Sequence, residues 1–446
     1  MLQTIDLRGQ KLTRAQLAAA LPRPSLDVDK ALAAVTPIID RVRAEGAVAL
    51  RDLAQKFDGV RPKHLRVPQS ALDTAEAGLS EQLRVALEIS IAHNRLGHQA
   101  QLPRPAVSEI VPGGIVRQRW VPVERVGLYV PGGLAVYPSS VIHNAVAAQV
   151  AGVTHIALAS PPQKEFGGLP HPTILAACKL LGITEVYAVG GAQAVAMFAY
   201  GATGEAGSSD GEVLCEPVDV VTGPGNIYVA AAKRAVRAVV GIDAEAGTTE
   251  IGIIADQNAN PEFVAADMLS QAEHDPAAAS ILITDCEQLA TAVDTALERY
   301  VAQTKHADRA RQALMGSQSG VVLTDSLAAS IEVANAYGAE HLEIHTNAAA
   351  EVAQQIHNAG AIFVGSYSPV PLGDYMAGSN HVLPTGGTAR FNSGLSVMAY
   401  IKSMQEIEYT QPAMAQLYSP LRALALDEDL PAHAHALQVR LGECDE

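Results

Sequence analysis

The chain has 446 residues, enough for two to four domains of ordinary size, which excludes a single small module. Apolar residues make up 48% of the chain and charged residues 17%, a balance that supports packed cores and excludes wholesale disorder. The net charge of −16 disfavours nucleic acid and anionic membrane surfaces as partners, because both present phosphates of the same sign.

The cysteines and the first residues both indicate a reducing, cytoplasmic location. The four cysteines stand far apart and form no CxxC pair, so neither a disulfide framework nor a thiolate zinc site is indicated. Asp6 and Arg8 lie where a signal peptide needs an apolar run. The stretch 126–163 lacks charged residues, but its prolines, glycines and serines are typical of a buried α/β segment and not of a membrane span.

The first quarter of the chain predicts an arm followed by helices. Residues 1–24 end in two prolines, Pro22 and Pro24, and are expected to dock elsewhere, as in an intertwined oligomer. From 27 to 101 the apolar residues recur every three or four positions, which predicts two or more long helices.

The middle of the chain predicts an α/β fold with two Rossmann-like, doubly wound lobes. Short β-branched runs that end in glycine- or proline-rich turns alternate with helical stretches over 126–250 and again over 251–392. The N-terminal helices, 25–125, are assigned to the second lobe. An insertion at 203–217, rich in glycine, serine and acid, reads as a surface loop, and 393–446 as a helical tail.

Three turns of the first lobe could bind phosphate. They lie at 131–133, 190–193 and 223–226, each after a predicted strand and before a helix, where backbone N–H groups are free. None is the GxGxxG fingerprint, and no acidic residue stands at the usual distance to hold a ribose. A dinucleotide site and ordinary tight turns both remain open.

The second lobe and the tail carry several groups of catalytic type. Gln271 and His274 share one face at the end of a predicted helix, as metal ligands or simply as polar surface. Glu340 and His341 open a strand, so their side chains point to opposite sides; they suit proton transfer, or a capped surface turn. The polar, glycine-rich segment 373–381 follows the last strand at its carboxyl end, where functional loops are expected.

Seven blocks in order over some 300 residues resemble the L-histidinol dehydrogenase family. They read ERVGLYVPGG, VGGAQAVA, TGPGNIYV, AGTTEI, LSQAEHD, AEHLEI and GDYMAGSNHVLPT, and the resemblance runs from about Pro122 to the last helix. It implies oxidation of L-histidinol to L-histidine, the last step of histidine biosynthesis, by two hydride transfers through an aldehyde. It also implies NAD and one zinc ion per subunit, incomplete Rossmann-like lobes, and a homodimer whose tails cross between subunits.

The resemblance also assigns site residues. Zinc would be held by four side chains, Gln271, His274, Asp374 and His433, the last coming from the partner's tail. His341 would be the general base, and Glu340 would activate the water that adds to the aldehyde. Contacts to NAD would come from Tyr129, Gln193 and Asn226. The substrate pocket would comprise the four zinc ligands and His341 together with Thr249, His381 and Glu428.

Some features depart from the family or leave alternatives. Thr248 stands where the family usually has proline, and His435 is a second imidazole beside His433, whose spacing from Glu428 better fits the closing helix. A dehydrogenase with the same fold, zinc and NAD but another alcohol, such as a sulfonated diol, remains open, although Glu428 and His381 suit a cationic substrate. A zinc hydrolase and a non-catalytic binding protein are further alternatives.

Overall fold

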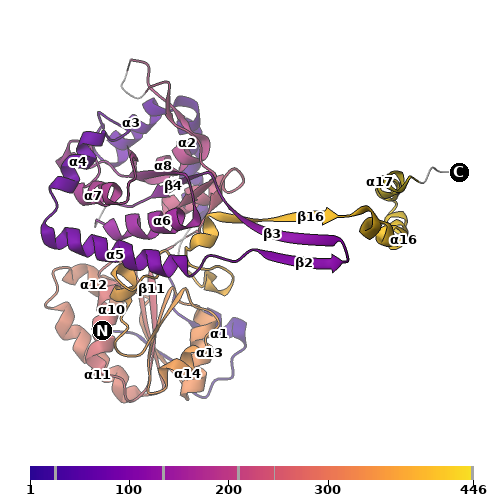
Figure 1. Cartoon of the computed structure of the whole chain (residues 1–446). Coiled ribbons are helices and arrows are strands. Elements are labelled where there is room, and N and C mark those ends of the chain that lie inside the picture. The colour runs from indigo at the N-terminus through magenta and orange to yellow at the C-terminus, as the bar shows by residue number, and fades with distance from the viewer. Residues whose placement is uncertain (25–27, 133–135, 208–210, 246, 443–446) are drawn as a thin grey trace. The chain divides into compact units, whose positions relative to one another are not determined.

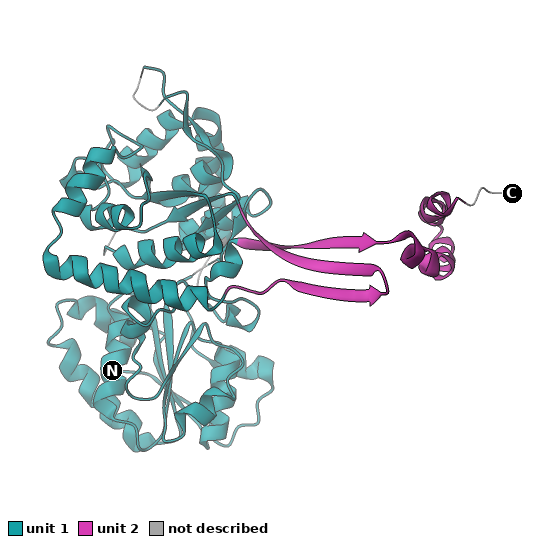
Figure 2. Ribbon diagram, in the orientation of Figure 1, with its two compact units in different colours: residues 1–101, 124–400 teal, residues 102–123, 401–446 magenta. Residues whose placement is uncertain are grey.

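The computed structural model describes residues 1–24, 28–132, 136–207, 211–245 and 247–442 (Figure 1). Gly133 of the first predicted turn and Asp210 of the insertion therefore lie outside the described residues. The chain forms two compact units, one of residues 1–101 and 124–400, the other of 102–123 and 401–446 (Figure 2). Within the described residues, no helix combines the length and apolar character needed to cross a bilayer.

The first lobe is built on a five-stranded parallel sheet, as the alternating pattern predicts. Its strand order is β10-β9-β4-β5-β6. The strands are β4 (Arg125–Tyr129), β5 (His155–Ser160), β6 (Glu185–Ala188), β9 (Val220–Thr222) and β10 (Gly241–Ile242). Because β5 follows β4 on one side and β9 flanks it on the other, the strand order reverses at β4, and ligands bind at such a point in open α/β sheets.

Helices cover this sheet, and the N-terminal helices are among them. They are α2 (Val28–Glu45), α3 (Ala47–Phe57), α4 (Gln69–Ala77), α5 (Glu81–Gln99), α6 (Pro138–Ala151), α7 (Pro172–Leu180), α8 (Gly191–Tyr200) and α9 (Ile227–Val236). Side chains of α2 and α3 share one apolar core with α8 and α9, while α4 packs on α7 and α5 on α6. The assignment of the N-terminal helices to the second lobe was therefore wrong, because the spacing shows which face is apolar and not what covers it.

The second lobe holds a six-stranded parallel sheet in the order β1-β13-β12-β11-β14-β15. The strands are β1 (Thr4–Asp6), β11 (Glu250–Ala255), β12 (Ala279–Thr284), β13 (Gly320–Leu323), β14 (His341–His345) and β15 (Ala361–Val364). The five predicted strands from β11 to β15 are confirmed. The first residues of the N-terminal arm dock on their own chain, where β1 adds to the edge of the sheet beside β13.

Two helical layers enclose the second sheet, with separate apolar cores on its two faces. One layer has α10 (Pro261–Ala272), α11 (Glu287–Val301) and α12 (Ala307–Met315), and the other has α1 (Arg14–Ala20), α13 (Leu327–Tyr337) and α14 (Ala349–Ala353) (Figure 1). A short helix, α15 (Val370–Tyr375), follows β15. β11, β12 and β13 are mostly apolar, as is typical of strands covered on both faces, whereas β14 also buries His341, Glu343 and His345.

The insertion and the tail contain strands that the sequence did not predict. β7 (Ala202–Thr203) and β8 (Val213–Cys215) pair within the insertion. In the second unit, β16 (Ile401–Tyr409) pairs antiparallel with β3 (Gly114–Pro122), which pairs with β2 (Ala106–Val111). The tail is thus helical only after β16, in α16 (Gln411–Asp427) and α17 (Pro431–Leu441).

Candidate active site

A cavity of about 1650 Å³ in the first unit is lined by residues of both lobes. It is larger than the pocket of a single small ligand and has room for a dinucleotide beside a second small molecule. Its wall contains most of the predicted site residues. These are Tyr129, Gln193, Asn226, Thr249, His274, Glu340, His341, Asp374 and His381.

The second lobe supplies its site residues from the amino ends of its strands. Thr249 immediately precedes β11, and Glu340 and His341 stand at the start of β14. The start of a strand, where the sequence placed Glu340 and His341, is thus the edge that the second lobe presents to the cavity, while the first lobe presents the carboxyl ends of its strands. Asp374 comes after β15, but α15 leads the chain back to the cavity wall.

Glu340 and His341 form a buried, hydrogen-bonded pair and not a surface turn. Glu340 Oε2 accepts hydrogen bonds from Thr249 Oγ1 at 2.6 Å and from the Glu250 backbone N–H at 2.9 Å, and lies 3.4 Å from His341 Nδ1. His341 Nδ1 also lies 3.3 Å from the Glu250 carbonyl oxygen. A carbonyl can only accept, so Nδ1 carries the proton. His341 Nε2 is buried without a partner among the described residues, which leaves its lone pair free.

Burial shifts both members of this pair towards their neutral forms. It raises the pKa of Glu340 to about 8, although the hydrogen bonds from Thr249 and Glu250 oppose the shift. Burial likewise lowers the pKa of His341. His341 is therefore a neutral imidazole at pH 7, which is the form that a general base requires.

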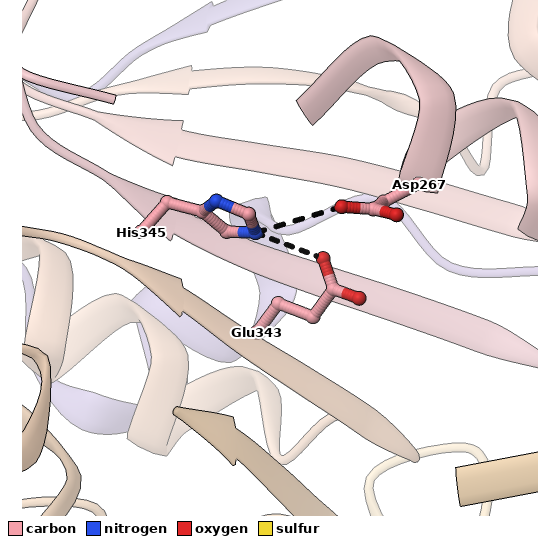
Figure 3. Close-up of side chains that lie close together, drawn as sticks. All are labelled: Asp267, Glu343 and His345. Carbon is pink, nitrogen blue, oxygen red and sulfur yellow. Dashed lines mark hydrogen bonds and ion pairs between the residues drawn. The ribbon is translucent and has the colours of Figure 1, made fainter. Parts of the chain in front are cut away.

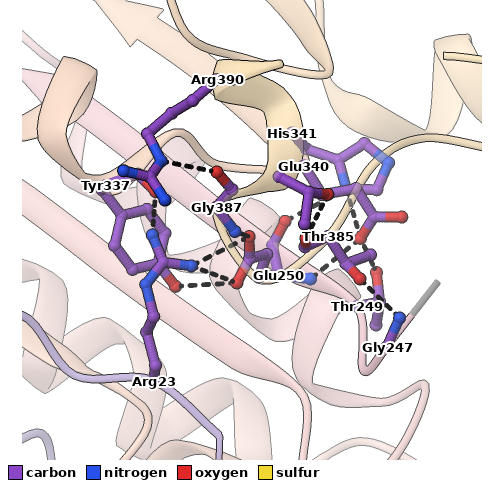
Figure 4. A network of polar contacts seen from close by, with 11 residues as sticks. Arg23, Gly247, Thr249, Glu250, Tyr337, Glu340, His341, Thr385, Gly387 and Arg390 are labelled. Atoms are coloured by element: carbon purple, nitrogen blue, oxygen red, sulfur yellow. Dashed lines mark hydrogen bonds and ion pairs between the residues drawn. The ribbon is translucent and has the colours of Figure 1, made fainter. Parts of the chain in front are cut away.

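A charged network lies behind the pair (Figure 4). Glu250 is fully buried, and its carboxylate meets the Arg23 guanidinium at 3.2 Å and accepts from the Tyr337 hydroxyl at 3.3 Å. The Arg23 guanidinium also stacks over the Tyr337 ring. Burial still raises the pKa of Glu250 to about 7, the charge of Arg23 being the main opposing effect. The N-terminal arm thus supplies the cation nearest to this buried acid.

Gln271, His274 and Asp374 offer donors that suit a zinc ion. Gln271 Nε2 donates to Thr249 Oγ1 at 2.5 Å, which leaves its amide oxygen for another partner. His274 Nδ1 donates to the Ser270 carbonyl at 2.9 Å, which leaves Nε2 as the coordinating atom, the usual arrangement of a ligating histidine. An imidazole, a carboxylate and an amide oxygen form a donor set of the kind zinc accepts.

The loop after α15 is held by α5, a role that the sequence did not indicate. Ser90 Oγ donates to the Tyr375 carbonyl at 2.6 Å, and Asn94 Nδ2 donates to the Ser379 carbonyl at 2.6 Å. Gly97 lies so close that an added Cβ would stand 1.9 Å from the Gly378 carbonyl oxygen. The buried polar face of α5, with Ser90, Asn94 and His98 at four-residue spacing, was the available signal.

His381 is fixed at the other end of this loop. Its ring stacks on that of His143, with centroids 4.1 Å apart, and its Nε2 lies 3.1 Å from Ser140 Oγ. Burial lowers the pKa of His381 to about 3, so the imidazole is neutral at any pH near 7. It presents a hydrogen-bonding group to the cavity and not a charge.

The first lobe presents two helix starts to the cavity. Tyr129 Oη accepts a hydrogen bond from the Gly191 backbone N–H at 3.1 Å at the start of α8, and Asn226 caps α9 through its side-chain oxygen. Gly223, at φ +119°, lies against the backbone of Tyr129, where an added Cβ would be 1.9 Å from the carbonyl oxygen. Two helix N-termini beside one cavity form a favourable environment for a pyrophosphate.

Two predicted site residues belong to the second unit. Glu428 ends α16 and His433 lies in the first turn of α17, and both side chains are exposed there. Their roles stay predictions.

A separate buried cluster joins Asp267 of α10 with Glu343 and His345 of β14 (Figure 3). His345 Nε2 lies 3.2 Å from Glu343 Oε2 and 3.6 Å from Asp267 Oδ2. Burial and, to a smaller extent, the neighbouring Glu343 charge raise the pKa of Asp267 to about 8. These atoms have the ligand types of a metal site, and they also satisfy one another through hydrogen bonds.

Known proteins of one family match this chain over nearly its whole length. Residues 21–441 match the family model described as "Histidinol dehydrogenase". Curated histidinol dehydrogenases from Thermobifida fusca and Mycobacterium tuberculosis are 56% and 54% identical over 441 and 440 residues, each alignment covering 99% of this chain and 98% of the relative. A crystal structure of histidinol dehydrogenase from Elizabethkingia anophelis superposes with a TM-score of 0.89 at 32% identity, covering 99% of this chain and 98% of that one. The chain therefore belongs to the histidinol dehydrogenase family and is an NAD-dependent dehydrogenase.

Proposed function

We propose that the enzyme oxidises L-histidinol to L-histidine in two steps, each passing a hydride to NAD, with one zinc ion per subunit. The observation that carries the proposal is the meeting, in one cavity, of the Glu340–His341 pair with the donors His274 and Asp374 and with the glycine turns of the first lobe. Family membership supports histidinol as the substrate and does not favour the sulfonated diol or the hydrolase.

In the first step His341 Nε2 takes the proton of the substrate hydroxyl while the carbon gives up its hydride, which forms the aldehyde histidinal. Water then adds to the aldehyde to give the hydrate, and the ionised form of Glu340, which becomes the main form above its pKa of about 8, takes a proton from that water. His341, reset by release of its proton, takes a hydroxyl proton of the hydrate as the second hydride leaves, and L-histidine results. Each step consumes one NAD and releases one NADH and one proton.

Zinc, when bound, would orient the substrate through its imidazole and amine nitrogens. Gln271, His274 and Asp374 would hold the ion, with His433 of the partner subunit as the fourth ligand. The hydrogen-bonded chain from Gln271 through Thr249 to Glu340 ties this donor set to the water-activating carboxylate. Tyr129, Gln193 and Asn226 would contact NAD, and Thr249, His381 and the partner subunit's Glu428 would complete the substrate pocket.

A homodimer with crossing tails is part of the proposal. Apolar side chains remain exposed on the second unit, including Val107, Ile110, Ile407 and Leu424. Exposed apolar groups in this number are typical of a surface that meets a partner.

We also propose the cytoplasm as the location. The described cysteines Cys178, Cys215 and Cys286 are all free thiols, which supports a reducing compartment.

Purified enzyme mixed with limiting histidinol and excess NAD tests the proposal. We expect two equivalents of NADH for each histidinol, read from the absorbance of the reduced nicotinamide, and one zinc per chain by metal analysis. No NADH from a zinc-loaded sample would overturn the proposed reaction. One equivalent, with histidinal accumulating, would overturn the second oxidation.

A further inference from the structure

The cavity extends beyond the catalytic residues into a part of the first lobe that no predicted site residue occupies. Pro37 and Ile38 of α2, and Phe57 and Asp58 at the end of α3, line it there. In Figure 1, α2 and α3 lie in the first lobe, whereas α10 and β11, beside the catalytic pair, lie in the second. A nicotinamide ring next to His341 therefore leaves this region to the other end of the dinucleotide, its adenosine.

The side chain of Asp58 makes no contact with the described residues that would stabilise the fold, although its backbone does. Its backbone N–H ends α3 by donating to the Ala54 carbonyl at 2.8 Å. Its side chain makes neither a hydrogen bond nor an ion pair with any described residue, and Oδ2 is buried. Burial raises the pKa of Asp58 to about 6, so it is mostly ionised at pH 7. An unpaired, half-buried carboxylate destabilises a protein, which favours a ligand that pairs with it.

No acidic residue stands at the end of the strand where a ribose-binding acid is usual; the nearest acid along the chain, Glu165, lies in the turn after β5 and is exposed on the cavity wall. In a complete Rossmann fold a carboxylate some twenty residues after the glycine turn accepts the hydroxyls of the adenosine ribose. Here the corresponding strand, β5, ends at Ser160 and continues into Pro161 and Pro162. Asp58 brings a carboxylate to the same cavity from a different element, close enough to Tyr129 to raise the pKa of that phenol further.

We propose that Asp58 accepts hydrogen bonds from the ribose hydroxyls of the adenosine half of NAD, and thereby selects NAD over NADP. A vicinal diol offers two donors to the two oxygens of one carboxylate, whereas a 2′-phosphate removes a donor and adds negative charge. The inference rests on the proposed function, since it takes NAD as the dinucleotide.

Cations on the cavity wall should favour a 2′-phosphate once Asp58 is removed. Arg41, Lys56 and Lys164 also line the cavity. Arg41 is paired with Glu45 and Asp52, while the Lys56 ammonium lies over the Phe57 ring. Without Asp58 the cavity wall would therefore tolerate a phosphate, and use of NADP should rise as use of NAD falls.

Steady-state kinetics of the zinc-loaded enzyme test the proposal with three cofactors: NAD, NADP and NAD carrying a 2′-deoxyadenosine. For Asp58→Asn we expect the KM for NAD to rise about tenfold, the size of one lost charge-assisted hydrogen bond, with kcat and the histidinol KM within twofold. Because kcat/KM for NADP should rise at the same time, the ratio of kcat/KM for NAD over NADP should fall by more than this factor. Glu165→Gln, which removes an exposed acid from the same cavity wall, is the matched control and should change neither.

The 2′-deoxy cofactor tests the contact between Asp58 and the ribose 2′-hydroxyl directly. Its KM with the unmodified enzyme should be several-fold above that of NAD, whereas Asp58→Asn should show the same KM for both, because the interaction is already lost. Equal KM values with the unmodified enzyme, or losses that multiply in the variant, would overturn the proposal. An unmodified enzyme that reduces no NAD with histidinol would instead overturn the proposed function.

Discussion

At the scale of single residues, the proposed mechanism uses His341 as the base in both oxidations and Glu340 in the hydration between them. His341 lines the cavity and its buried Nε2 has no partner among the described residues, and Glu340 is fixed by Thr249 and Glu250. His341→Asn should lower histidinol oxidation by about 10²- to 10⁴-fold, the usual contribution of a general base, with normal zinc content. Glu340→Gln should slow the oxidation of added histidinal more than that of histidinol. Loss of zinc in the first variant, or equal losses in the second, would contradict these roles.

Asp267 predicts how stability depends on pH. Its folded-state pKa of about 8 lies above the ordinary value of 3.8, so the folded protein keeps a proton that the unfolded chain releases. The contribution of this group to the free energy of unfolding therefore falls as pH rises from about 4 to 8, by up to about 1.4 kcal/mol per pH unit.

Asp267→Asn keeps a hydrogen-bonding side chain of similar size beside His345 and Glu343, but this side chain cannot titrate. The unfolding midpoint of the unmodified enzyme should fall more steeply between pH 5.5 and pH 7.5 than that of the variant, at equal protein concentration. Glu332→Gln, an exposed acid on α13, is the control and should follow the unmodified enzyme. Parallel curves for all three proteins would show that Asp267 is ionised in the folded state.

The sequence suggested Glu340 and His341 as candidates for catalysis but gave no information on their surroundings. Glu340 and His341 could be named from their chemistry, whereas their burial and the free Nε2 depend on β11 packing beside β14. Asp58 could not be singled out, because an acid at a helix end is an ordinary surface feature in sequence. Only the cavity around it shows that its carboxylate lacks a partner.

At the scale of elements, α5 acts as the support of the loop that carries Asp374 and His381. Gly97 has no room for a side chain beside Gly378. Alanine normally stabilises a helix by about 1 kcal/mol relative to glycine, so any loss in Gly97→Ala must come from displacement of this loop. We expect kcat/KM for histidinol to fall at least tenfold while helix content by circular dichroism is unchanged.

A second glycine serves as the control for that variant. Gly78 ends α4 with helical dihedral angles, and an added Cβ would meet only ordinary contacts at 3.4 and 3.6 Å. Gly78→Ala should therefore leave activity unchanged and stability equal or slightly higher. Full activity of Gly97→Ala would mean that the loop is positioned without α5.

Strands could be predicted where the local sequence alone indicates them, without knowledge of the neighbouring strand. Strands such as β4, β5, β11 and β12 are rich in apolar residues, largely buried and closed by turns, so they stand out locally. β16 was missed because its nine residues, IKSMQEIEY, are mostly exposed and do not alternate cleanly. β1 has only three residues, and it becomes a strand because β13 offers it an edge.

At the scale of the whole molecule, the proposal divides each active site between two chains. His274 belongs to the first unit and His433 to the second, and the proposed dimer pairs each lobe with the partner's tail. Variants His274→Ala and His433→Ala should each be inactive, because each dimer lacks one ligand in both sites.

Mixing the two inactive variants should restore activity if the tails cross. After co-refolding or co-expression, half of the dimers are mixed, and one of the two sites in each mixed dimer has both histidines, so activity should return to about one quarter of the unmodified level. If each tail served its own lobe, every site would lack a histidine and the mixture would stay inactive. Zinc content provides the independent readout, since only the restored sites should bind the ion with full affinity. An inactive, zinc-poor mixture with proven mixed dimers would therefore require the tail to serve its own chain.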